Sequence, residues 1–245
     1  MKTGLVSVTF RELAFSEIID LVIKSGLDGI EWAGDTHCLP GDKETAREIS
    51  ALMKENGLVT LSYGSYYKLK AEIDFNLILD NAVLLETNNI RVWAGDKGSV
   101  ETGDDERQLI VKDTQRIADM ARIHNIDISF EYHDHTLTDT IESTVRLLSE
   151  IDRESVYTYW QAPADSNPGE NIEDIKKLVE INKLKNLHIQ EWDSSGRTAL
   201  SAAGEKWKQY IRAAAQADPA LLLEFVKDDC PEQFLDDAKA LVSLH

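Results

Sequence analysis

Eight short apolar runs alternate with eight longer amphipathic stretches, and this alternation restricts the possible folds more than any other feature of the sequence. The apolar runs are predicted strands and cover residues 5–10, 29–32, 59–66, 89–95, 126–132, 156–161, 186–192 and 220–226. The amphipathic stretches are predicted helices and cover about residues 16–26, 43–56, 75–86, 105–124, 139–151, 172–181, 205–217 and 231–242. Such alternation predicts parallel strands that are joined by crossover helices.

Eight strand–helix units in 245 residues favour a closed barrel over an open sheet. We therefore predict an α/β fold, a single (β/α)8 TIM barrel, that occupies residues 1–245 as one domain. At the first helix we expect Ser16 to be the N-cap and Gly26 to end the helix.

Charge and cysteine content limit the partners and the compartment. The formal net charge of −18 argues against nucleic acid and anionic membranes as partners. Cys38 and Cys230 are too few for a disulfide framework, which favours a cytoplasmic location. The first residues lack the apolar core of a signal peptide, and no run of about 18 apolar residues predicts a membrane span.

Strand side chains alternate between two faces, and the two predicted faces differ in polarity. The face that we expect to pack on the helices is apolar and includes Val6, Val8, Ile30, Trp32, Leu61, Ile128, Phe130, Leu187, Ile189, Leu221 and Leu223. The face that we expect to point into the lumen includes Glu31, Ser62, Arg91, Trp93, Ser129, Glu131, Tyr159, Gln161, His188, Leu222 and Glu224. Buried polar groups of this kind need partners.

Four of these polar residues lie at the ends of consecutive predicted strands: Glu131, Gln161, His188 and Glu224. In a closed barrel these strand ends are neighbours on one arc of the rim. A divalent cation would relieve the repulsion between the two carboxylates and use all four groups as ligands. A simpler reading of any one glutamate is a salt bridge, for which Arg91 is available. His133, two residues after Glu131, should face the same cavity.

The chain resembles the xylose isomerase-like barrels, which include sugar phosphate isomerases and epimerases. The matching stretches run over essentially the whole chain and include "GLDGIEWAGD", "FEYHDHTLTDT", "YTYWQAP", "NLHIQEW" and "LLLEFVKDD". The resemblance implies a divalent metal, manganese first, with magnesium, cobalt or zinc as alternatives. Its usual ligands, Glu, Asp, His and Glu, correspond to Glu131, Gln161, His188 and Glu224. Gln161 departs from this pattern, since a carboxylate is expected there, and the two consequences to expect are weaker metal binding or a different metal.

The resemblance also implies a reaction. In the family's epimerases two metal-binding glutamates exchange a proton with the substrate through an enediolate, and Glu131 and Glu224 would have this role. The substrate would be a ketose, a keto-sugar or a related polyol. A homodimer is an allowed assembly.

Further residues near the predicted strand ends are candidates for substrate binding. His133 and Lys227 could contact substrate hydroxyls, and Arg197 could bind an oxyanion. Aromatic side chains suit the apolar face of a sugar, although rim packing is an equal reading for them; they are Trp32, Trp93, Trp160 and Trp192.

Two other functions remain open at this stage. A dehydratase that acts on an inosose or a dehydroshikimate-like substrate could use the same metal site, because an enediolate beside a leaving hydroxyl eliminates water. A metal-free sugar-binding barrel is the second, since Gln161 is neutral. The acidity of the chain disfavours the endonuclease branch of the family.

Overall fold

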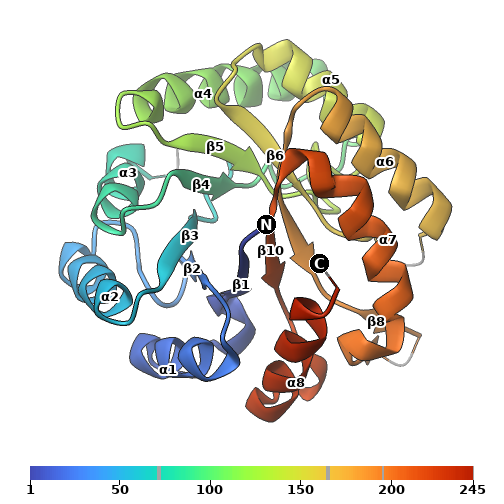
Figure 1. The fold of residues 1–245 in the computed structure, drawn as a ribbon. Coiled ribbons are helices and arrows are strands. Elements are labelled where there is room, and N and C mark those ends of the chain that lie inside the picture. The colour runs from blue at the N-terminus through green and yellow to red at the C-terminus, as the bar shows by residue number, and fades with distance from the viewer. Residues whose placement is uncertain (71–72, 164–165, 195, 245) are drawn as a thin grey trace.

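The computed structural model describes residues 1–70, 73–163, 166–194 and 196–244. Within them, eight parallel strands close into a barrel in the order β1-β10-β7-β6-β5-β4-β3-β2. The strands are β1 Thr3–Val6, β2 Gly29–Ala33, β3 Val59–Gly64, β4 Asn89–Val92, β5 Asp127–Phe130, β6 Val156–Trp160, β7 Leu184–Ile189 and β10 Ala220–Leu223. The predicted single (β/α)8 TIM barrel is confirmed (Figure 1).

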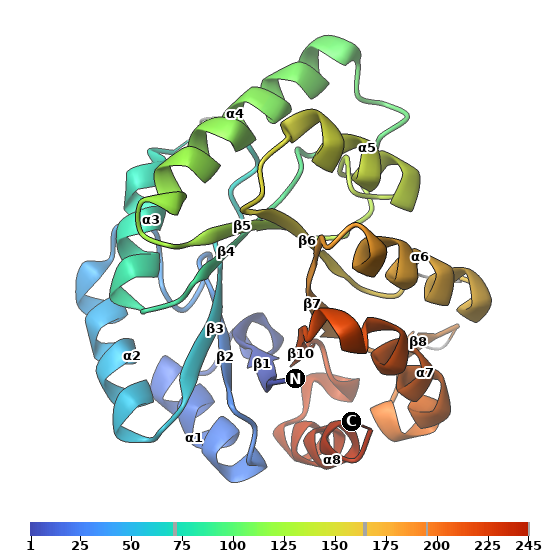
Figure 2. The ribbon, with the colours of Figure 1, turned by 45° about the horizontal axis from the view of Figure 1, so that its top comes forward.

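The helices form a layer outside the ring of strands (Figure 2). They are α1 Phe15–Ser25, α2 Lys43–Glu55, α3 Phe75–Leu84, α4 Asp104–Arg122, α5 Ile141–Ile151, α6 Pro168–Glu180, α7 Gly204–Ala214 and α8 Pro231–Val242. No helix in the described ranges is both long and apolar enough to cross a bilayer.

The starts of α1 and α6 differ from the sequence prediction, and α5 begins at Ile141, two residues later than predicted. Ser16 is not the N-cap of α1: Ala14 is, and its backbone N–H donates to the Glu17 carboxylate at 2.8 Å. Helix α6 begins four residues earlier than predicted, because the Asn167 side chain accepts from Gly169 N–H and Pro168 fits the first helical position. Gly26 does end α1, with a left-handed φ of 73°.

The core lies between the barrel and the helices. Outward-facing strand residues, such as Ile30, Ile128 and Leu187, are fully buried against the helix layer. Val6, Val8 and Leu61 were expected on this face, and that prediction is wrong, since none of them belongs to the helix-facing core cluster. Val6 pairs with Glu31 and packs with Tyr159 and Leu222 in a second cluster, because the chain leaves β1 after Val6 for a 3-10 turn. Leu61 packs on the same cluster beside a register shift in the β2–β3 pairing.

A short antiparallel pair in the loop after β7 was not predicted. It consists of β8 Trp192–Asp193 and β9 Gly196–Arg197. The Arg197 guanidinium lies 5.0 Å from the Trp192 ring centre and 4.6 Å from that of Phe225. It also forms an ion pair with Asp229, so the loops after β7 and β10 are joined at the mouth of the barrel.

We expect Gly29→Ala to lower the free energy of unfolding by about 1–3 kcal/mol, the usual cost of overpacking. A Cβ on Gly29 would lie 2.1 Å from the carbonyl oxygen of Val59 on the neighbouring strand, and backbone cannot move aside easily. Urea denaturation measures the difference. The matched control is Gly204→Ala in the first turn of α7, where the nearest atom is 3.7 Å away. Equal stability of the two variants would contradict the described β2–β3 contact.

Candidate functional site

The carboxyl ends of four neighbouring strands carry the candidate site. Glu131, Gln161 and Glu224 each follow the last residue of β5, β6 and β10, and His188 is the last residue but one of β7. The backbone keeps pairing beyond the strand ends, since Glu131 N–H donates to the Val92 carbonyl oxygen and Glu224 N–H to that of Ile189. This pairing fixes which way the side chains point.

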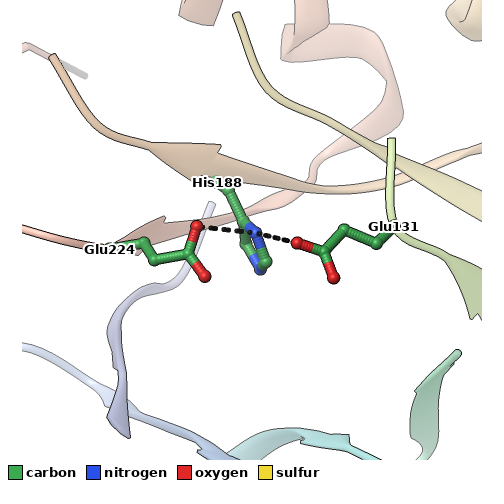
Figure 3. A group of neighbouring side chains, drawn as sticks. All are labelled: Glu131, His188 and Glu224. Carbon is green, nitrogen blue, oxygen red and sulfur yellow. Dashed lines mark ion pairs between the residues drawn. The ribbon is translucent and has the colours of Figure 1, made fainter. Parts of the chain in front are cut away.

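The ring of His188 lies at the centre of the cluster, with the two glutamates on either side of it (Figure 3). Its Nδ1 is 3.3 Å from Glu224 Oε2 and 3.9 Å from Glu131 Oε1. Glu131, His188 and Glu224 each offer one ligand atom, and these atoms lie within 4.8 Å of one another. The structure therefore brings these three residues together, as the strand phase predicts.

Gln161 belongs to the same cluster. Its side-chain Oε1 lies 3.2 Å from His188 Nδ1 and 3.5 Å from Gln190 Nε2. The amide oxygen thus points at the position where the two carboxylates and the imidazole converge. It can serve as a fourth, neutral donor.

A layer of polar side chains lies deeper in the barrel. Within it, the sequence analysis gave roles only to Arg91, as a salt-bridge partner of a glutamate, and to Trp93, as a substrate-binding candidate. Arg91 connects two carboxylates: its Nε donates to Glu31 Oε1 at 2.7 Å and its Nη1 to Glu131 Oε2. Glu31 Oε2 accepts from the Tyr159 hydroxyl at 2.7 Å. Trp93 Nε1 donates to Glu131 Oε2 at 2.5 Å. The signal for this layer was present in the sequence, because all of these residues are on the face that was predicted to point inward.

The charges of the buried layer and the cluster do not balance. Three carboxylates, those of Glu31, Glu131 and Glu224, are at most 5% exposed, and the buried guanidinium of Arg91 compensates one of them. Two negative charges remain when His188 is neutral. Uncompensated buried charge is costly, and a divalent cation would remove the imbalance. The donor set and its charge therefore fit a divalent metal.

The pKa values of the cluster respond to the same imbalance. Burial alone would lower the pKa of His188, but Glu224 and Glu31 raise it to about 10. Burial alone would raise the pKa of Glu31, but the Arg91 cation lowers it to about 2. The metal-free site therefore holds His188 as an imidazolium, which supplies part of the missing positive charge.

Two of the predicted substrate-binding residues adjoin the cluster. Trp93 donates to Glu131 as described above. The ring of His133 stacks on the ring of Trp93, and the two ring centres are 4.8 Å apart. His133 Nδ1 lies 2.8 Å from a carboxylate oxygen of Asp134, and the side chain is 30% exposed. His133 and Trp93 thus form one wall of the rim beside Glu131.

Trp32 and Trp160 lie elsewhere. Both are fully buried among the core residues that face the helices. Trp32 packs edge-on against His37, and Trp160 packs against Trp207 and Tyr210. The reason is the alternation of strand side chains. Trp32 follows the inward-facing Glu31, and Trp160 precedes the inward-facing Gln161, so both tryptophans point outward toward the helices.

Trp192, Arg197 and Lys227 lie in the loops above the barrel. Trp192 is 46% exposed and carries the Arg197 guanidinium on its ring. Arg197 is paired with Asp229, which competes with an anionic ligand for this cation. Lys227 is exposed in the 3-10 turn Lys227–Asp229.

Comparisons with known proteins agree with the fold. A family model described as xylose isomerase-like TIM barrel matches residues 19–242. A 3-dehydroshikimate dehydratase of Bacillus anthracis is 29% identical over 211 residues, which cover 78% of this chain and 74% of that protein.

Two solved structures show the same fold. The probable 3-DHS dehydratase involved in petrobactin synthesis from Bacillus anthracis has a TM-score of 0.84 at 22% identity, with 99% of both chains covered. The D-psicose 3-epimerase from Clostridium cellulolyticum H10 has a TM-score of 0.73 at 19% identity, with 99% of this chain and 97% of that chain covered. The named relatives are enzymes.

We expect the stability of the metal-free protein to fall as the pH rises from about 6.5 toward about 10. The pKa of His188 is raised in the folded state, so its pairing with Glu224 stabilises the fold fully below its ordinary pKa of 6.5. This contribution is lost as the imidazolium deprotonates near pH 10. Urea denaturation of chelator-treated protein across this range measures it. In His188→Gln this part of the pH dependence should be absent, and an unchanged slope would contradict the described pair.

Proposed function

We propose a function from one established premise: this chain belongs to the xylose isomerase-like TIM barrel family. The proposed function is that of a divalent-metal-dependent sugar isomerase or epimerase that acts on a ketose, a keto-sugar or a related polyol. One observation supports it above the others. The cluster of Glu131, His188 and Glu224 is buried, convergent and short of two positive charges.

The metal would be held by Glu131, Gln161, His188 and Glu224. Three oxygen donors and one imidazole suit manganese, with magnesium, cobalt or zinc as alternatives. A bound divalent cation would polarise the carbonyl group of the substrate and make the neighbouring C–H acidic.

The two glutamates are the proposed acid and base. Glu131 Oε2 is held by Arg91 and Trp93, so Oε1, which faces His188 Nδ1, would have to serve both as the ligand atom and as the oxygen that takes or gives a proton. Glu224 lies on the other side of His188 (Figure 3). One glutamate would remove a proton from the substrate carbon to give an enediolate, and the other would return a proton to it. His133 and Trp93 at the rim would bind the substrate, with Trp192, Arg197 and Lys227 in the loops above.

A dehydratase is the second candidate, and the similarity to the Bacillus anthracis dehydratase favours it. The same proton abstraction would be followed by cleavage of a neighbouring C–O bond. The second carboxylic acid would give its proton to the departing hydroxyl, so that water leaves and a C=C bond forms. A metal-free sugar-binding barrel would leave one buried negative charge uncompensated even with His188 protonated.

Product identity separates these candidates. The protein is incubated with manganese in D₂O with a panel of ketoses, cyclitols and dehydroshikimate. An isomerase or epimerase yields a product that gains deuterium without losing water. A dehydratase yields a product that lacks one water molecule. Manganese-independent binding without turnover of any sugar would favour the non-catalytic reading.

We expect Glu131→Gln and Glu224→Gln each to reduce turnover by at least about 10²–10⁴-fold, the usual contribution of a general acid or base. The amide keeps the shape of the side chain but cannot take the proton. Steady-state rates on the substrate found in the panel provide the measurement, and circular dichroism checks the fold. The matched control is Glu205→Gln on α7, where the side chain is 89% exposed. Near-normal rates in either site variant would rule out the two-glutamate mechanism.

We expect Gln161→Asp to increase manganese affinity by about ten-fold or more, because a carboxylate adds a negative charge beside the cation. Isothermal titration calorimetry of chelator-treated protein measures the change. Gln190→Glu adds the same charge at a residue whose amide contacts Gln161, and it should have a smaller effect because Gln190 is not a proposed ligand. Unchanged or weaker binding by the aspartate variant would mean that Gln161 is not a ligand.

A further inference from the structure

We propose that Glu31 is a positioning residue for the metal site: it holds the ring of His188 and, through Arg91, the carboxylate of Glu131. This inference rests on the proposed function, because it concerns the same metal. Glu31 is not among the four strand-end residues, and its side chain is fully buried below them.

The place of Glu31 in the barrel allows these contacts. Strand β2 is three strands away from β7 in one direction and three strands away from β5 in the other. The side chain of Glu31 faces inward and therefore reaches His188 from across the lumen. It also reaches Arg91, which pairs with Glu131. Tyr159 comes from β6, the strand opposite β2, and binds the second oxygen of Glu31 at 2.7 Å.

The two ring nitrogens of His188 face different groups. Nδ1 faces the side chains of Glu131, Gln161 and Glu224. Nε2 is buried and makes no hydrogen bond to any described residue, but it lies 3.5 Å from Glu31 Oε1. A histidine that binds a metal through one nitrogen carries its proton on the other, and a carboxylate beside that proton fixes the tautomer and the ring orientation. Glu31 is placed to do this for Nε2, which leaves Nδ1 for the metal.

Arg91 extends the effect to the second ligand. Glu31 Oε1 accepts from Arg91 Nε at 2.7 Å, and Arg91 Nη1 holds Glu131 Oε2. This arrangement leaves Glu131 Oε1 on the side of His188. Gly64 makes room for the connection, since a Cβ there would lie 2.6 Å from Arg91 Nη2 and 3.1 Å from Glu31 Oε1. One carboxylate thus orients two candidate ligands that come from different strands.

The negative charge of Glu31 is the property that this role requires. A neutral amide of the same shape could fill the space and still bond to Tyr159. It would accept more weakly from Nε2–H of a metal-bound imidazole, and it would leave Arg91 with Glu131 as its one carboxylate partner among the described residues. Arg91 would then compete more strongly with the metal for Glu131.

The test compares manganese affinity with stability in Glu31→Gln. Isothermal titration calorimetry of chelator-treated full-length protein should show about 10–100-fold weaker binding than in the unsubstituted protein, as is usual when the partner of a ligating histidine is lost. The matched control is Tyr159→Phe, which removes the hydrogen bond to Glu31 but keeps its charge. It should lower the midpoint of thermal unfolding and leave manganese affinity nearly unchanged.

The tautomer of His188 gives a readout that a merely structural role would not change. With ¹⁵N-labelled histidine and diamagnetic Zn²⁺, the NMR spectrum should show the proton of His188 on Nε2 in the unsubstituted protein. Glu31→Gln should show a mixture of tautomers or loss of the bound form at the same Zn²⁺ concentration.

Equal manganese affinity in Glu31→Gln and the unsubstituted protein would overturn the inference and leave the proposed function intact. Absence of saturable binding in the unsubstituted protein would overturn both. If Glu31→Gln does not fold, Glu31→Asp replaces it, because the shorter side chain keeps the charge but withdraws it from Nε2. Weaker binding by Glu31→Asp supports the inference, and unchanged binding overturns it.

Discussion

The imbalance between three buried carboxylates and one buried guanidinium is the constraint on which the rest of the site depends. Glu31, Glu131 and Glu224 meet Arg91 and His188 where each of these side chains is at most 5% exposed. Such a group of charges is stable only if a cation completes it, either a proton on His188 or a metal. The raised pKa of His188 and the convergence of the ligand atoms are two consequences of this single requirement.

A closed parallel barrel is well suited to meet this requirement. Each strand places alternate side chains in the lumen, and all strands end at the same rim. Polar groups from β2, β4 and β6 can therefore meet in the lumen, where each finds a partner, while β5, β7 and β10 present theirs at the rim. The outer faces of the strands remain apolar and bind the helix layer. Along each strand, one residue therefore packs against the helices and stabilises the fold, and the next residue points into the lumen and contributes to the polar site.

Much of this arrangement follows from the sequence, because strand phase is a local property. Because strand side chains alternate between two faces, the sequence alone predicts that Glu131, His188 and Glu224 share the inward face. This alternation failed at Val6 and Val8, where the chain turns into a 3-10 helix, and at Leu61, where the strand register shifts. The bridge of Arg91 between Glu31 and Glu131 joins side chains from three strands, so no local pattern specifies it. The positions of Trp32 and Trp160 followed from phase, although their aromatic character favoured a rim location.

The central claim is that His188 Nδ1 and the two glutamates bind one divalent cation. Pulsed electron paramagnetic resonance of the manganese-loaded protein tests it most directly, because ¹⁴N coupling reports an imidazole ligand. We predict one Mn²⁺ per chain, with coupling to the nitrogen of a single imidazole that disappears in His188→Gln. A bound Mn²⁺ without nitrogen coupling, or coupling that persists in His188→Gln, would contradict the account.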